Sequence, residues 1–156
     1  MELNRRNSLK KMVLTAASFV GASFMAKSAV LSSGTAVKKA KQVGSVVTKD
    51  DVPLFSSVIK HGDLVYVAGI GAHFKGDIKS HTDHVLTELE KVLKGAGSSM
   101  EKVIKASVFL HDLDDYDGMN EVFKGRFGNT PPVRTTVAVG GVPGASLVEI
   151  DVIAYV

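Results

Sequence analysis

TPPVRTTVAV, at residues 130–139, is the stretch from which the fold and the candidate site can be worked out. Pro131 and Pro132 fix the backbone and donate no hydrogen bonds, and the β-branched run that follows them predicts a strand. Side chains alternate along a strand, so Arg134 and Thr136 share one face. A buried charge needs a partner. The partner of Arg134 is either a carboxylate of the protein or a ligand carboxylate, which a guanidinium grips with two parallel hydrogen bonds.

The start of the chain has the pattern of a targeting segment. A basic head that contains the Arg5–Arg6 pair precedes a modestly apolar run of small residues over 12–25, which is too short for a membrane anchor. The pattern indicates a secretory leader over residues 1–29 and resembles a twin-arginine export signal. We therefore expect a periplasmic or secreted protein without stable membrane insertion. A cytoplasmic protein with a basic tail is the alternative if the leader does not function.

The leader distorts the net charge of the chain. Five of the 19 lysines and arginines and one of the 16 acidic residues lie in residues 1–29, which leaves 14 basic and 15 acidic residues, a net charge of −1, for residues 30–156. This balance gives no electrostatic support to a nucleic-acid groove. The sequence has no cysteine, which excludes disulfides, a thiol nucleophile and a cysteine-ligated metal.

Hydrophobic periodicity predicts one α+β domain over residues 45–156, after a linker over 30–44. A helix over 77–94 carries a continuous apolar stripe and ends at glycines. A second helix is predicted from Asp114 or Asp115 through Phe127. The predicted strands cover residues 55–60, 64–70, 103–113, 133–139 and 147–154, with a further short edge strand near 42–47. We expect a two-layer sandwich of a mixed six-stranded sheet and two helices, with Arg134, Thr136 and Glu149 on the face that the helices leave open.

Several motifs together resemble a known family. PVRTTV at 132–137, VP at 142–143 and LVEIDVIA at 147–154 look like the C-terminal signature of the YjgF/RidA family of enamine/imine deaminases, and GDLVYVAG at 62–69 resembles its first signature. The intervening segments follow in the family's order, so the resemblance covers about residues 45–156. It implies a chorismate-mutase-like fold, a homotrimer with three clefts between subunits, and no cofactor.

The resemblance also implies roles for individual residues. In the family, the arginine that matches Arg134 grips the carboxylate of the small-molecule substrate, and the glutamate that matches Glu149 positions or activates water. The products are a 2-keto acid and ammonia. Imine hydrolysis needs a carboxylate clamp, an acid–base group and water, and it needs no metal. Besides the catalytic pair, the expected substrate-binding residues are Gly69, Thr136, Phe55 and Asn120, the last of which has a structural hydrogen-bonding role as its alternative.

The sequence departs from the family pattern in three places. Ala68 and Ile70 stand where the family has serine and glutamine, Phe55 stands where it has tyrosine, and the loop over 71–77 is shorter than usual. These changes leave the candidate site unusually apolar. They predict either a substrate with a larger apolar side chain or a protein that binds 2-keto acids or similar carboxylates without turnover. A structural trimer, in which Arg134 pairs permanently with Glu149, is the third possibility.

Two other patterns have ligand-binding spacing. His81 and His84 lie at i and i+3 near the start of a predicted helix, a spacing that can bind zinc, although surface histidines are common there. The acidic run over 112–117 lacks the glycine and the distal glutamate of a calcium loop, and a helix cap with a solvated acidic face explains it better. We therefore expect no metal site.

Overall fold

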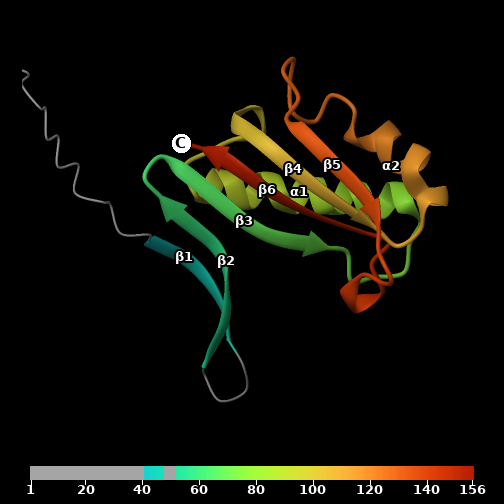
Figure 1. Ribbon diagram of the computed structural model, residues 1–156, viewed down its shortest axis with the longest axis horizontal. Helices are drawn as coiled ribbons and strands as arrows, with labels where there is room; N and C mark the ends of the chain where they lie inside the picture. The colour runs from blue at the N-terminus through green and yellow to red at the C-terminus, as the bar shows by residue number, and fades with distance from the viewer. Residues whose placement is uncertain (1–40, 48–51) are drawn as a thin grey trace, which may run out of the picture. The chain divides into compact units, whose positions relative to one another are not determined.

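Six strands and two helices make up the part of the chain that the computed structural model describes, residues 41–47 and 52–156 (Figure 1). The mixed sheet has the order β1-β2-β3-β6-β4-β5, and only the β4–β5 pair is parallel within this part of the chain. The predicted α+β class, with six strands and two helices, is confirmed. The strands are β1 Lys41–Val47, β2 Pro53–His61, β3 Leu64–Gly71, β4 Val103–Leu110, β5 Val133–Ala138 and β6 Val148–Tyr155, and the helices are α1 Ile78–Gly95 and α2 Tyr116–Phe123.

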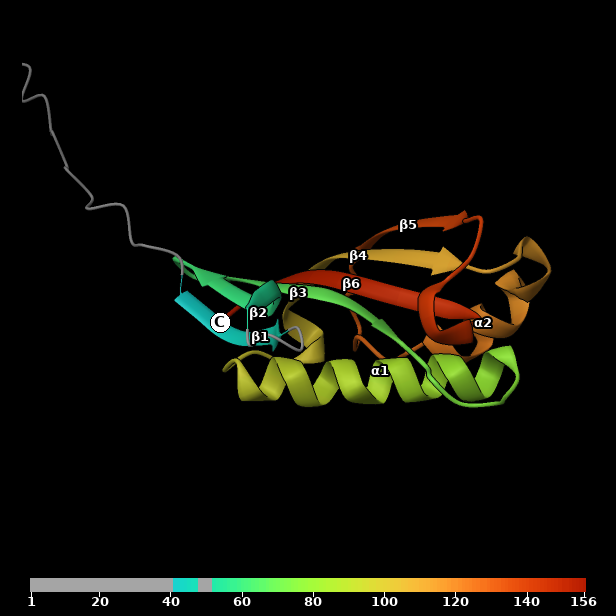
Figure 2. The ribbon, with the colours of Figure 1, turned by 90° about the horizontal axis from the view of Figure 1, so that it is seen from below.

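Helix α1 lies along one face of the sheet (Figure 2). Asp77 caps it by accepting a hydrogen bond from the backbone N–H of Ser80 at 2.8 Å, as expected for an N-cap aspartate. The predicted apolar stripe is its buried face, because leucines 86, 89 and 93 are all fully buried against the sheet. The opposite face of the sheet, called here the open face, has no helix of the described residues on it.

The strand register assigns each side chain of β6 to a face. Val148, Ile150 and Val152 point into the helix-covered core, whereas Glu149 and Asp151 are half-buried on the open face. This alternation is the one predicted from the sequence.

The predicted face of Arg134 is wrong. Arg134 pairs in register with Ala106 of β4, and Ala106 is fully buried on the helix side, so Arg134 lies on the helix side too. Glu149 pairs with Phe109 on the open face, and β4 separates β5 from β6. Within one chain, Arg134 and Glu149 are therefore on opposite faces and on strands that are not neighbours. A permanent pair between Arg134 and Glu149 therefore does not form within one chain.

Two element boundaries also differ from expectation. Strand β4 ends at Leu110, and Asp112 then caps a 3₁₀ turn over Leu113–Asp115 by accepting a hydrogen bond from the N–H of Asp114 at 3.0 Å. Helix α2 begins after that turn and ends at Phe123 rather than at Phe127. The chain turns extended at Lys124, and Phe127 still packs on Phe123 with ring centroids 4.7 Å apart. The helical spacing of the apolar residues therefore continues to Phe127 because Phe127 contacts Phe123, although the helix itself ends at Phe123.

The predicted leader over residues 1–29 lies outside the described residues, so cleavage and export stay predictions. The helices of the described part of the chain are too short or too polar to span a bilayer. Strand β1 corresponds to the edge strand expected near residues 42–47.

Candidate functional site

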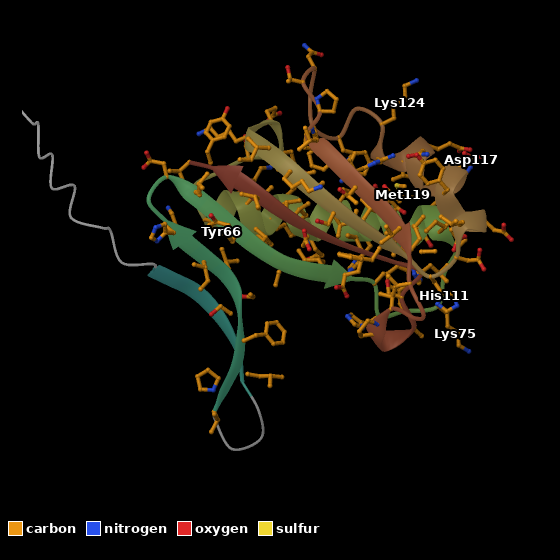
Figure 3. The ribbon with its side chains drawn as sticks, viewed as in Figure 1. Tyr66, Lys75, His111, Asp117, Met119 and Lys124 are labelled. Atoms are coloured by element: carbon orange, nitrogen blue, oxygen red, sulfur yellow. The ribbon has the colours of Figure 1, made fainter. Side chains whose placement is uncertain are left out.

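Arg134 is held by three side chains of α2. Its guanidinium carbon lies 4.6 Å from the centroid of the Phe123 ring, which is within cation–π range. Nη1 lies 3.8 Å from the Met119 sulfur, and Nη2 donates to the Tyr116 hydroxyl at 3.4 Å. Figure 3 shows Met119 on the β5 side of the sheet, with Tyr66 at the opposite, β2–β3 side. These contacts fix the guanidinium without neutralising its charge.

No acidic side chain of the described residues forms an ion pair with Arg134. Arg126, the other arginine after the leader, contrasts with it, because Nη1 of Arg126 lies 2.6 Å from Asp83. A guanidinium with aromatic and thioether neighbours and no acid keeps its hydrogen-bonding edges for an anion. The arrangement suits a ligand carboxylate.

Thr136 lies two residues from Arg134 on the same, helix-covered face of β5, because it pairs with the fully buried Val108 of β4. Its predicted place on the open face is therefore wrong. Its hydroxyl is buried and has no hydrogen-bond partner among the described residues. An unsatisfied buried hydroxyl costs free energy, so a ligand or water that bonds to it gains affinity. Asn120 lies on α2 beside Met119, and its backbone carbonyl accepts a hydrogen bond from Lys124 at 3.1 Å. The role predicted for the Asn120 side chain stays a prediction.

Gly69 and Glu149 come together on the open face. A β-bulge between Val67 and Ile70 interrupts the β3–β6 ladder, and the Glu149 carboxylate fills the space that a Cβ at position 69 would take. Bulges recur next to functional sites because they redirect side chains. Here the bulge brings a carboxylate over a backbone that has no side chain.

Gly69→Ala is expected to displace the Glu149 carboxylate while leaving the fold intact, because the new methyl group meets the end of a flexible side chain. We expect the melting temperature to stay within a few degrees and kcat/KM to fall by about 10²-fold, the order of effect of a 1 Å misplacement in an active site. Thermal unfolding, together with kinetics of the imine hydrolysis that the family resemblance implies, measures this for both proteins. Wild-type kinetics in the variant would contradict the assignment of Glu149.

Glu149 also lines a hollow of about 190 Å³, and among the described residues that line this hollow it is the only charged one. The remaining walls come from β4 and from the loop between β5 and β6, and they are Phe109, Val139, Gly141, Val142 and Pro143. The apolar character expected from Ala68 and Ile70 thus extends to this wall.

Phe55 is not part of this constellation within one chain. It lies on β2 beyond the last register pair with β3, Val58–Val67, where β2 pairs with β1 instead. Its side chain is half exposed. Phe55 can reach a site only if another copy of the chain packs against strands β1 and β2.

The histidine pair at the start of α1 does not form a zinc site. His81 is buried and uses both ring nitrogens: Nε2 lies 3.0 Å from the Phe74 carbonyl, and Nδ1 accepts the N–H of Leu147 at 3.1 Å. Residues 41–47 and 52–156 contain no cluster of three or more potential metal ligands.

In the acidic run over 112–117, burial of the Asp115 carboxyl raises its pKa, and the negative charge of the neighbouring Asp112 raises it further.

Sequence reasoning missed the residues that hold Arg134 and those that shape the open-face hollow. Tyr116, Met119 and Phe123 have the spacing of one helix face, a pattern that core residues share, so their contact with Arg134 does not follow from the sequence. Val142 and Pro143 belong to a turn whose position over Glu149 depends on the path of the chain between β5 and β6. Only the proximity of α2 to the arginine strand along the chain gave a usable signal.

Comparison with known proteins identifies the family. A family model described as Ribonuc_L-PSP, Endoribonuclease L-PSP, matches residues 49–156. The chain belongs to this family. Within the Ribonuc_L-PSP family, the RutC family protein UK114 of Drosophila melanogaster is 40% identical over 121 residues, which are 73% of this chain and 88% of the relative. The resemblance to the YjgF/RidA family is confirmed.

Two further members of the Ribonuc_L-PSP family are named for deaminase chemistry or as RidA. Reactive Intermediate Deaminase A of Arabidopsis thaliana chloroplasts is 30% identical over 133 residues, 78% of this chain and 68% of the relative. The crystal structure of RidA from the Antarctic bacterium Psychrobacter sp. superposes with a TM-score of 0.64 at 27% identity and covers 74% of this chain and 96% of that one. The fold is therefore shared with solved members of the family.

Proposed function

We propose that the protein hydrolyses enamine and imine intermediates of amino acids to 2-keto acids and ammonia. The observation that carries this proposal is the Arg134 guanidinium, which α2 holds through uncharged groups and no acid of the described chain neutralises. An imino acid offers the carboxylate that such a guanidinium binds with two hydrogen bonds. RNA cleavage fits the charges less well, because residues 30–156 carry a net charge of −1.

Glu149 supplies the acid–base chemistry of the proposed reaction. Its carboxylate takes a proton from water, and the water oxygen forms a bond to the imine carbon while the C=N π electrons move to nitrogen. The nitrogen takes up two protons in all. The carbinolamine hydroxyl loses its proton and becomes the carbonyl as the C–N bond breaks, and ammonia leaves. The 2-keto acid keeps its carboxylate on Arg134 throughout.

The proposed site lies between subunits of a homotrimer. Arg134 and Glu149 are on opposite faces of one sheet, so a substrate that touches both must bridge two copies of the chain. The open face supports such packing, because it presents large apolar side chains to solvent. Val133, Tyr66 and Val137 are 69%, 40% and 42% exposed, respectively.

An imine-hydrolysis assay on the purified domain tests the proposal. An amino-acid oxidase generates short-lived imino acids in place, semicarbazide traps those that survive, and the amino-acid side chain is varied from small to large. We expect the protein to lower the yield of trapped imine, most strongly for large apolar side chains, because apolar residues line the hollow beside Glu149. An unchanged yield with every amino acid would contradict the deaminase.

A carboxylate-binding protein without turnover is the second candidate. Ala68 and Ile70 remove a hydroxyl and an amide that the family usually places at this wall, which favours binding over catalysis. Calorimetric binding of 2-keto acids by a protein that hydrolyses no imine would establish this alternative. The third possibility is a structural trimer that binds no carboxylate. In that case Arg134 has no ligand-binding role.

A further inference from the structure

The loop between β3 and α1 fixes the position of His73 from both sides. The N–H of Ala72, a fully buried residue, donates to the Ser146 hydroxyl at 2.8 Å. The carbonyl of Phe74 lies 3.0 Å from Nε2 of His81, and the two rings meet edge to face with centroids 4.8 Å apart. Since Nδ1 of His81 accepts the N–H of Leu147, its Nε2 carries the proton and donates to Phe74. A short loop with both neighbours anchored leaves His73 little freedom of position.

The side chain of His73 lies between two glycines. Its ring occupies the space that a Cβ at Gly144 would take, and Gly144 follows Pro143, which lines the open-face hollow. A Cβ at Gly71 would lie 3.7 Å from Nε2 of His73. His73 is exposed, and none of the hydrogen bonds found in residues 52–156 involves its ring. The His73 ring is thus exposed beside Gly71 and Gly144.

Gly71 is also the register partner of Glu149. The Glu149 carboxylate lies over Gly69, two residues back along β3, which corresponds to about 6.6 Å. The Glu149 carboxylate therefore lies against Gly69 and the His73 ring lies near Gly71, and neither glycine has a side chain.

We propose that His73 is the general acid of the hydrolysis, the group that gives protons to the imine nitrogen, while Glu149 is the base that takes protons from water. This inference rests on the proposed function. Histidine is the residue type that exchanges protons most readily near neutral pH, and a reaction that adds water and expels an amine needs both a proton acceptor and a proton donor. The hydrogen bonds of Ala72 and Phe74 hold His73 beside Gly71 and Gly144.

The proton transfers balance over one turnover. Glu149 takes a proton from water as the C–O bond forms, and His73 gives its proton to the nitrogen as the C=N π bond breaks. His73, which is exposed to solvent, is reprotonated and gives a second proton as the C–N bond breaks, so that neutral ammonia leaves, and a second reprotonation from solvent restores His73. The carbinolamine hydroxyl and Glu149 return their two protons to solvent, and the net change is imine plus water to ketone plus ammonia.

Chemical rescue tests the assignment. His73→Ala is expected to lower kcat by about 10²- to 10⁴-fold, the usual contribution of a positioned acid or base. Added imidazole is expected to restore much of that loss in His73→Ala and none in Glu149→Ala. His61→Ala is the matched control, because His61 is an exposed histidine at the β2–β3 turn. It should behave as wild type, with and without imidazole.

The possible outcomes separate this inference from the proposed function. Wild-type kinetics in His73→Ala would overturn the role of His73 and leave the deaminase standing. A loss in His73→Ala that imidazole does not restore, repeated in His73→Asn, would assign the ring a packing role against Gly144 and also overturn it. A wild-type protein that hydrolyses no imine would overturn both proposals.

Discussion

Arg134→Ala is expected to lower kcat/KM for imino acids by about 30- to 5000-fold and to leave the fold and the oligomeric state unchanged. The range corresponds to the 2–5 kcal/mol lost when one partner of a desolvated charge pair is removed. The fold should persist because Arg134 lies on the edge strand β5 and is only half-buried, so the substitution removes no more than the contacts of its side chain with α2. Steady-state kinetics, with size-exclusion chromatography of the same sample, measure both parts of the expectation.

Arg126 provides the control, and a conservative substitution of Arg134 separates charge from shape. Arg126→Ala removes an ion pair with the exposed Asp83 and a 3.2 Å hydrogen bond to Thr87. Such a pair contributes about 0–1 kcal/mol, so we expect a small loss of stability and unchanged kinetics. Arg134→Lys keeps the charge but loses the planar two-pronged donor, and its activity should lie between wild type and Arg134→Ala. Equal activity in Arg134→Ala and wild type would exclude the carboxylate clamp.

The layers of the fold could be predicted because burial leaves a periodic trace in the sequence. The stripe of leucines 86, 89 and 93 has helical spacing and only one side that can face a core, so α1 and its orientation follow. The alternation of Val148, Glu149 and Ile150 is equally one-sided, and it correctly predicts that Glu149 lies on the open face. In both elements, charge and hydrophobicity separate the two faces.

The face of Arg134 could not be predicted because β5 lacks that separation. Val133 and Val137 look like core residues, yet they lie on the exposed side, while the charged Arg134 turns toward α2. An edge strand can present apolar residues outward when another surface is to cover them, so its apolar face does not identify the interior. The order of the sheet, with β6 between β3 and β4, depends on pairing between distant segments and leaves no local pattern.

Buried polar groups were missed for a related reason. His81 has the position of a surface histidine on its helix, and its burial depends on a carbonyl seven residues earlier and an N–H 66 residues later. Ser146 likewise joins Ala72 to the start of β6 across 74 residues. The hydrogen bonds between the 71–77 loop and the start of β6 fix the positions of Glu149 and His73. They join residues far apart in the chain, so the local sequence pattern does not predict them.

Glu149→Gln is expected to lower kcat by about 10²- to 10⁴-fold with little change in KM. Glutamine keeps the shape of the side chain, and therefore its fit over Gly69, but it cannot accept a proton from water. Because the carboxylate clamp is a different residue, the variant should bind a 2-keto acid as tightly as wild type does. Kinetics and isothermal titration on the same protein measure the two effects separately.

Asp151→Asn is the matched control, since Asp151 is a half-buried carboxylate on the same face of β6, two residues further along. We expect wild-type kinetics from it, so that loss of negative charge on the open face alone cannot explain a slow Glu149→Gln. If Glu149→Gln keeps full activity, Glu149 is not the base. If it loses both turnover and 2-keto acid binding, Glu149 contributes to the fit of the ligand, and the division of labour between clamp and base is wrong. Lost turnover with retained binding, set beside an Arg134→Ala protein that loses both, is the result that only a hydrolytic site with separate clamp and base predicts.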